Sequence, residues 1–138
     1  MNLDIFKKEF RSRFVVSEQT FLAFQQCSRD FNPLHTKESF AQGKGFPSCV
    51  MYGNILNAFL SYFVGMMLPV PDVIIHSQDI VFRNPFFLND TLDFLAEVSN
   101  ISEAVQAVEF KYTFRKENGL LVAKGHIQIG LLESVEKQ

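Results

Sequence analysis

Apolar residues recur with an extended period in some stretches of the chain and with a helical period in others. Residues 10–16 favour a strand. Ser17 is a typical N-cap residue for a helix over residues 18–27, whose apolar side chains fall on one side. One or two helical turns are predicted over residues 36–42, closed by the glycines that follow them.

The longest helix is predicted over residues 53–68, and it is apolar nearly all round. A helix of this kind has to be covered on most of its surface. One stripe differs, because it recurs at spacings of three and four and contains only the small or polar residues Asn54, Asn57, Ser61 and Gly65. Either this stripe packs closely against another backbone or it lines a cavity.

The second half of the chain changes to the extended period. Four strands are predicted, with turn-forming residues between them, over residues 73–83, 91–99, 105–115 and 120–131. Asn118-Gly119 is the strongest turn signal, because both residues accept the positive φ of a tight hairpin. The simplest interpretation is three consecutive hairpins in a mostly antiparallel sheet.

These elements together predict an α+β domain in which an antiparallel sheet wraps one long central helix, which is the hotdog architecture. With 138 residues, of which 47% are hydrophobic, the chain suits one domain over residues 1–138. Such a sheet keeps an exposed edge, and pairing with a second copy is the usual way to cover it. We therefore expect a homodimer or a higher homo-oligomer.

The central segment is the one candidate for a membrane span. No charged residue lies between Lys44 and Asp72, but prolines near both ends shorten its helical part. A helix of about 15 residues at about 1.5 Å per residue spans roughly 22 Å, which is less than the ~30 Å hydrocarbon thickness. We therefore interpret it as a buried helix and expect no membrane partner.

Charge and cysteine content narrow the other possibilities. The formal net charge is −2 and the basic residues form no stripe, so we expect no nucleic-acid partner. Cys27 and Cys49 are the only cysteines and form no CxxC pair, and no His stands at ligand spacing from them. We therefore expect no metal site, no disulfide framework and a reducing, cytoplasmic location.

The segment CSRDFNPLH, residues 27–35, carries the candidate chemistry. Its Asn-Pro step suits neither a helix nor a strand, and Pro33 turns the chain sharply between Asp30 and His35. A carboxylate and an imidazole within reach of one water form a general acid–base pair. The alternative is that Asp30 only makes an Asx turn and that His35 is merely solvated. The two other histidines, His76 and His126, lie in predicted strands and receive no role.

Gly53 is the third candidate, because it stands at the start of the long helix. A helix N-terminus offers unpaired N–H groups with positive dipole character. A thioester carbonyl placed there would have its developing enolate charge stabilised. The alternative is that Gly53 only permits a tight start to the helix.

The segment 21–69, with its D-F-N-P-L-H core and its Tyr-Gly pair at the start of the long helix, resembles the MaoC-like dehydratases. These are the (R)-specific enoyl-thioester hydratases among the hotdog proteins. The resemblance continues through QDIVFRNPFFLNDTL and covers most of the chain. It implies that Asp30 and His35 hold and activate a water, that the Gly53 N–H binds the thioester oxygen, and that Ser61 lies near the pair.

Tyr52 departs from the family pattern, since many members have His-Gly where this chain has Tyr52-Gly53. The backbone N–H is retained, but the neighbouring side chain differs, which leaves the acyl-chain preference and the direction of net flux open. The residues that we expect to contact the substrate are Asn32, Tyr52, Asn57 and Ser61.

The resulting prediction is a hydro-lyase without cofactor or metal. It would hydrate trans-2-enoyl thioesters and dehydrate (R)-3-hydroxyacyl thioesters, carried on CoA or on acyl carrier protein. One competitor is a hotdog thioesterase. Many such enzymes place a carboxylate on the central helix, and this chain has no Asp or Glu between Glu38 and Asp72, which disfavours that function. The other is a non-catalytic module that binds acyl thioesters or a protein partner.

Overall fold

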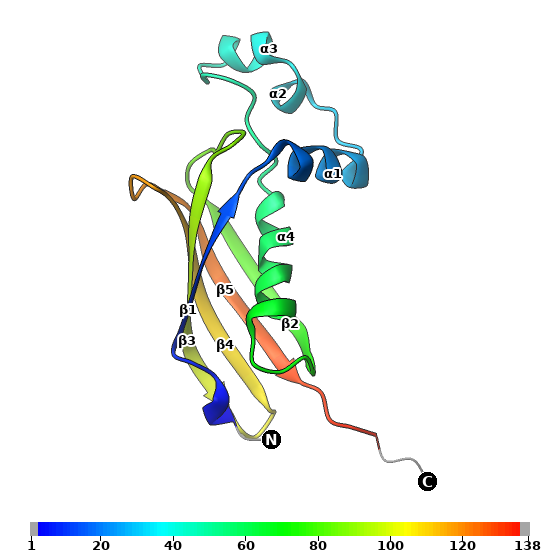
Figure 1. Cartoon of the computed structure of the whole chain (residues 1–138), viewed down its shortest axis with the longest axis vertical. Helices are drawn as coiled ribbons and strands as arrows, with labels where there is room; N and C mark the ends of the chain where they lie inside the picture. The colour runs from blue at the N-terminus through cyan, green and yellow to red at the C-terminus, as the bar shows by residue number, and fades with distance from the viewer. Residues whose placement is uncertain (1–2, 136–138) are drawn as a thin grey trace.

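The computed structural model describes residues 3–135. Five strands form one antiparallel sheet in the order β1-β3-β4-β5-β2, and the helices lie over one face of it and at one end (Figure 1). The strands are β1 Glu9–Val15, β2 Val73–Phe82, β3 Thr91–Ser102, β4 Ala107–Lys116 and β5 Leu121–Leu131. The α+β hotdog architecture predicted from the sequence is thereby confirmed.

Three helices gather at one end of the sheet (Figure 1). They are α1 Glu18–Ser28, α2 Pro33–Thr36 and α3 Glu38–Gly43, and a single 3₁₀ turn, η1 Leu3–Ile5, precedes β1. The predicted cap of α1 is confirmed, because the Ser17 side chain accepts a hydrogen bond from the Thr20 N–H.

The central helix α4, Ile55–Tyr62, crosses the sheet and continues as a π-helical segment, η2 Phe63–Met67. The helix predicted over 53–68 is therefore present, but its last turn is wider than an α-helix. Phe63 stands at this change and is fully buried. Its ring lies 5.1–5.5 Å, centroid to centroid, from the rings of Phe10, Phe94 and Phe110. Aromatic packing of this kind fixes the helix against β1, β3 and β4.

The place of β2 differs from the prediction. Consecutive hairpins would pair β2 with β3, whereas β2 pairs with β5 at the far edge, with Ile80 opposite Gly125. Only the β3–β4 and β4–β5 hairpins are confirmed. The β4–β5 turn also differs in detail, since Gly119 alone has a positive φ there, of 88°, and Asn118 does not.

Side chains alternate between the two faces of the sheet, as expected for strands. Along β3, Leu92, Phe94 and Ala96 are buried towards α4, while Asp93 faces the other way and pairs with Arg13 of β1 at 2.8 Å. The core is thus a Phe-rich layer between the sheet and α4. Within residues 3–135, no helix has the length and apolar character that a membrane span requires.

Candidate active site

Short polar side chains shape the loop that follows α1. The N–H of Asp30 donates to Ser28 Oγ at 3.2 Å, and the N–H of Asn32 donates to Asp30 Oδ1 at 3.0 Å. The N–H of Leu34 then donates to Asn32 Oδ1 at 2.9 Å. Each side chain therefore holds the backbone two residues further on, as in Asx turns. Asp30 does make the Asx turn considered from the sequence, but with one carboxylate oxygen only.

The Asn-Pro step lies at the start of a helix. Asn32 is the N-cap of α2 and Pro33 is its first residue. The prediction that this step suits no helix is wrong, because the first helical position needs no N–H partner and has the φ that proline already holds. The cap uses Oδ1 of the Asn32 side chain, and its contact with a substrate stays a prediction. The helical turns predicted over 36–42 begin earlier, with α2, and resume in α3.

Asp30 and His35 come together across this loop. Asp30 Oδ2 lies 3.9 Å from His35 Nε2, which is too long for a direct hydrogen bond. A water about 2.8 Å from each atom fits a separation of this size. The Asp30 side chain is 45% exposed and the His35 side chain 16%, so water reaches the pair from the carboxylate side.

The His35 ring is held in one orientation by its other nitrogen. His35 Nδ1 lies 2.6 Å from the carbonyl oxygen of Val50. A carbonyl only accepts, so in the neutral ring Nδ1 carries the hydrogen and Nε2 keeps its lone pair. That lone pair points to the side of Asp30, where it is free to take a proton from a water.

Gly53 lies near the same ring. A cavity of about 310 Å³ is lined by His35, Met51, Gly53, Phe82, Arg83 and Phe86, among others. Among residues 3–135 the Gly53 N–H has no hydrogen-bond acceptor, as expected just before a helix. A Cβ on Gly53 would lie 2.9 Å from Cε1 of Phe82, so the missing side chain also makes room for that ring.

Tyr52 lies behind the pair. It is 2% exposed, its hydroxyl donates to the backbone carbonyl of Asp30, and Gln25 Nε2 donates to that hydroxyl at 3.2 Å. Its ring centroid lies 4.2 Å from that of His35. Tyr52 lines neither of the two cavities beside His35, so its side chain does not have the substrate-facing position that we expected.

The small and polar stripe of α4 lies elsewhere. Asn57 donates to Asn54 Oδ1 at 2.8 Å and accepts from Gln78 Nε2 of β2 at 2.6 Å. Ser61 is exposed. Neither Asn57 nor Ser61 lines the cavity that contains His35 and Gly53. The structure thus brings together Asp30, His35 and Gly53, and leaves Asn57 and Ser61 on the side of α4 that faces β2 and solvent.

Comparison with known proteins shows the family to which the chain belongs. A model of the MaoC-like domain matches residues 6–118. The chain belongs to the MaoC-like family. Over 98 residues it is 31% identical to a 3-hydroxybutyryl-CoA dehydratase of Methylorubrum extorquens, which covers 71% of this chain and 59% of that relative. The chain therefore spans less than two thirds of that relative's length.

Two further comparisons cover more of both proteins. A mitochondrial 3-hydroxyacyl-[acyl-carrier-protein] dehydratase of Arabidopsis thaliana is 25% identical over 118 residues, covering 83% of this chain and 70% of that one. The solved structure of an (R)-hydratase from A. caviae has a TM-score of 0.82 and 26% identity, covering 89% of this chain and 93% of that one.

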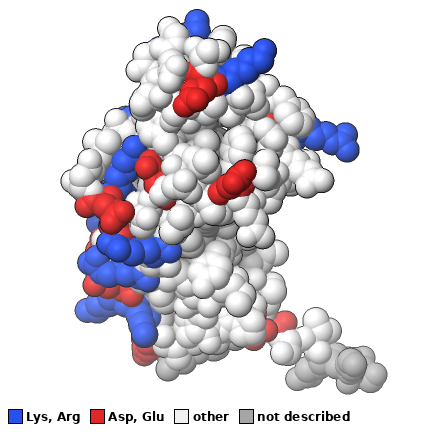
Figure 2. Space-filling view, turned by 45° about the horizontal axis from the view of Figure 1, so that its top comes forward, with Lys and Arg blue, Asp and Glu red and all other residues white. Residues whose placement is uncertain are grey.

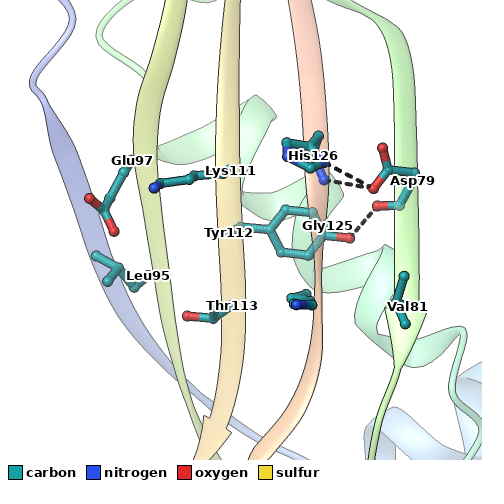
Figure 3. Close-up of a pocket in the computed structure, with 10 residues that line it drawn as sticks. Asp79, Val81, Leu95, Glu97, Lys111, Tyr112, Thr113, Gly125 and His126 are labelled. Atoms are coloured by element: carbon teal, nitrogen blue, oxygen red, sulfur yellow. Dashed lines mark hydrogen bonds and ion pairs between the residues drawn. The ribbon is translucent and has the colours of Figure 1, made fainter.

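A second hollow of the MaoC-like chain lies on the sheet face away from α4 and measures about 360 Å³ (Figure 3). Glu97, Lys111, His126 and Asp79 stand opposite one another across four strands there. His126 Nδ1 lies 3.3 Å from Asp79 Oδ1, and both side chains are more than half exposed, at 57% and 63%. The contact between His126 and Asp79 is open to water, and none of the described helices begins at this hollow, which makes it a poorer site for thioester chemistry.

Tyr112 of β4 lines this hollow, and its side chain reaches past Gly125 of β5 to β2. Its hydroxyl donates to the carbonyl of Asp79 at 2.7 Å. Burial, helped by the charge of Asp79, raises the pKa of Tyr112, so the phenol stays protonated and keeps donating.

Within residues 3–135, no group of three His, Cys, Asp or Glu side chains is arranged to hold a metal ion.

Proposed function

We propose that this MaoC-like chain is a hydro-lyase that adds water to trans-2-enoyl thioesters and removes it from (R)-3-hydroxyacyl thioesters. The observation that carries the proposal is that His35 Nε2 lies 3.9 Å from Asp30 Oδ2 and that His35 and Gly53 line the same cavity. The names of the three relatives, two dehydratases and one hydratase, support the same reaction class.

In the hydration direction the Asp30–His35 pair acts first as a base and then as an acid. A water held between Asp30 Oδ2 and His35 Nε2 gives its proton to the pair and attacks C3 of the enoyl thioester. Electrons move through the double bond to the thioester oxygen, where the Gly53 N–H stabilises the enolate. The pair then returns a proton to C2, which restores the thioester and leaves a 3-hydroxyacyl product.

The walls of the cavity support a short or medium acyl chain as substrate. Met51, Phe82 and Phe86 give it apolar surface, and its volume is about 310 Å³, at the small end of ligand pockets. One relative is named for a CoA thioester and another for an acyl carrier protein thioester. Both carriers present the same thioester to the pair, so we include both as substrates.

A homodimer is the second part of the proposal. Among residues 3–135, β2 is an edge strand that pairs with β5 alone, and α4 and η2 beside it carry exposed apolar side chains. Tyr62 is 49% exposed, Met66 72% and Ile74 51%. Figure 2 shows a group of Lys and Arg along one side with Asp and Glu among them, further charged side chains towards the top, and a broad uncharged surface below these. A second copy covers both the strand edge and this apolar surface.

We also propose a cytoplasmic location, supported by the two cysteines. Cys27 and Cys49 are both free thiols, and Cys27 is exposed. An exposed thiol persists in a reducing compartment. Cell fractionation tests this location, and recovery of the chain only from an oxidising compartment would contradict it.

A two-signal assay tests the reaction. Purified protein is mixed with crotonyl-CoA or a longer trans-2-enoyl-CoA, while the enoyl thioester absorbance and the release of free thiol are followed together. We expect the absorbance to fall without thiol release, because water adds to the double bond and the thioester stays intact. Thiol release without hydration would indicate a thioesterase, and the absence of turnover with CoA and carrier-protein substrates would leave a binding module.

A further inference from the structure

We propose that Tyr52 is a positioning residue, which fixes Asp30 and His35 relative to the Gly53 N–H. The inference deepens the proposed function and rests on it. Its starting point is that one buried side chain contacts both members of the pair. The Tyr52 hydroxyl donates to the backbone carbonyl of Asp30, and the Tyr52 ring packs 4.2 Å from the ring of His35 at an interplanar angle of 32°.

Tyr52 is itself held from the opposite side by α1. Phe21 stacks on it at 5.4 Å between centroids, and Phe24 lies at 4.9 Å. Gln25 Nε2 donates to its hydroxyl, which leaves the hydroxyl hydrogen for the Asp30 carbonyl. The phenol therefore packs between α1 and the loop of Asp30, and its hydroxyl both donates and accepts a hydrogen bond. Because Tyr52 is fixed in this way, it restricts the movement of the Asp30 backbone and of the His35 ring, which it contacts.

The loop itself has few other anchors to the core. Asp30 and its neighbours from Arg29 to Asn32 are exposed, and apart from the bond with Tyr52 their hydrogen bonds are local, reaching at most five residues along the chain. The Tyr52 hydroxyl is the contact that joins the Asp30 backbone to a buried residue. Loss of that hydroxyl therefore frees the carboxylate end of the pair more than the histidine end, which keeps its bond to Val50.

Tyr52 is also the neighbour of Gly53 in the chain, which links the pair to the proposed enolate site. Tyr52 directly precedes Gly53, so the residue that holds the pair is joined by one peptide unit to the N–H proposed to receive the thioester oxygen. The peptide unit is planar and stiff. The separation between the proton-transfer groups and the enolate site is therefore set at Tyr52. Reactivity depends steeply on such placement, with about a hundredfold lost for an error of about 1 Å.

The test compares two tyrosine-to-phenylalanine variants. Tyr52→Phe and Tyr112→Phe each remove one hydroxyl that donates to an aspartate backbone carbonyl, but only Tyr52 is beside the pair. We expect kcat for hydration to fall about tenfold in Tyr52→Phe with KM within about twofold, because a held geometry is lost and no substrate contact is. Tyr112→Phe should keep kcat, although it loses a comparable buried hydrogen bond.

A second readout needs no turnover. His35 Nε2 lies 3.9 Å from the Asp30 carboxylate, so the imidazole NMR signals of His35 report on the position of Asp30; they should broaden or shift in Tyr52→Phe and remain in place in Tyr112→Phe. Equal kcat values and unchanged His35 signals in both variants would overturn the positioning role while the wild-type hydratase activity still stands. If the wild type hydrates no enoyl thioester, the proposed function fails, and the His35 signals alone then decide whether Tyr52 positions the pair.

Discussion

Individual polar side chains around Asp30 act on the backbone before they act on any substrate. The two carboxylate oxygens of Asp30 have different partners: Oδ1 accepts from the Asn32 N–H, and Oδ2 lies towards His35. Asn32 then caps α2, the helix that carries His35. The convergence of Asp30 and His35 followed from the sequence because Pro33 lies between them. The contacts of Tyr52 did not, because its partners Gln25 and Asp30 lie 27 and 22 residues away.

Asn32 gives a test at this scale. Asn32→Ala removes the oxygen that accepts from the Leu34 N–H, while Asn32→Asp keeps an acceptor in the same place. We expect Asn32→Ala to lower the free energy of unfolding by about 0.5–2 kcal/mol, as for other N-cap losses, and Asn32→Asp to stay near the wild type. Urea unfolding followed by circular dichroism measures both. Equal stability of the Ala and Asp variants would show that the cap does not hold this loop.

Elements were predicted well where the signal is local and less well where it is not. Residue spacing located the five strands, α1, and the segment formed by α4 and η2 to within a few residues. The partner of β2 was missed, because hairpin reasoning pairs neighbours in sequence, whereas β2 leaves α4 at the edge beside β5. Gly125, a glycine inside a predicted strand, could have indicated the missing contact. A glycine inside a strand often marks a close approach of another chain segment, and here Tyr112 and the Asp79 carbonyl occupy that space.

The packing of β2 against β5 can be tested at Gly125. A Cβ there would lie 2.0 Å from the Asp79 carbonyl oxygen and 2.7 Å from the Tyr112 hydroxyl. We expect Gly125→Ala to lower the melting temperature and to cost about 1–3 kcal/mol, as overpacking does. Gly43→Ala is the matched control, because nothing lies within 4 Å of its Cβ position. Similar melting temperatures for the two variants would contradict the close approach at β2.

The whole molecule has a strongly uneven surface. In the view of Figure 2 many Lys and Arg side chains lie along one side, with others at the top and on the opposite side, while α4 and η2 contain no charged residue. The sequence predicted that a sheet edge would need a partner. It did not predict which edge, because the order of the strands decides that β2, beside the exposed face of α4, is the edge with apolar surroundings.

The oligomeric state is the prediction at this scale. We expect light scattering after gel filtration to give a mass of twice the 15.8 kDa of the chain. Met66→Lys should shift the mass towards the monomer, because it buries a charge in the proposed contact. Val105→Lys is the control, since Val105 is similarly exposed, at 64% against 72% for Met66, but lies at the β3–β4 turn. A monomeric wild type would contradict the homodimer.

The central claim is that Asp30 and His35 work as one unit on a single water. Its most direct measurement is kcat/KM for enoyl-CoA hydration in Asp30→Asn, His35→Gln and the double variant. We predict that each single change lowers kcat/KM by about a hundredfold or more, and that the double variant falls little further, because either loss already disables the pair. Near wild-type hydration in either single variant, or losses that multiply in the double variant, would contradict the claim.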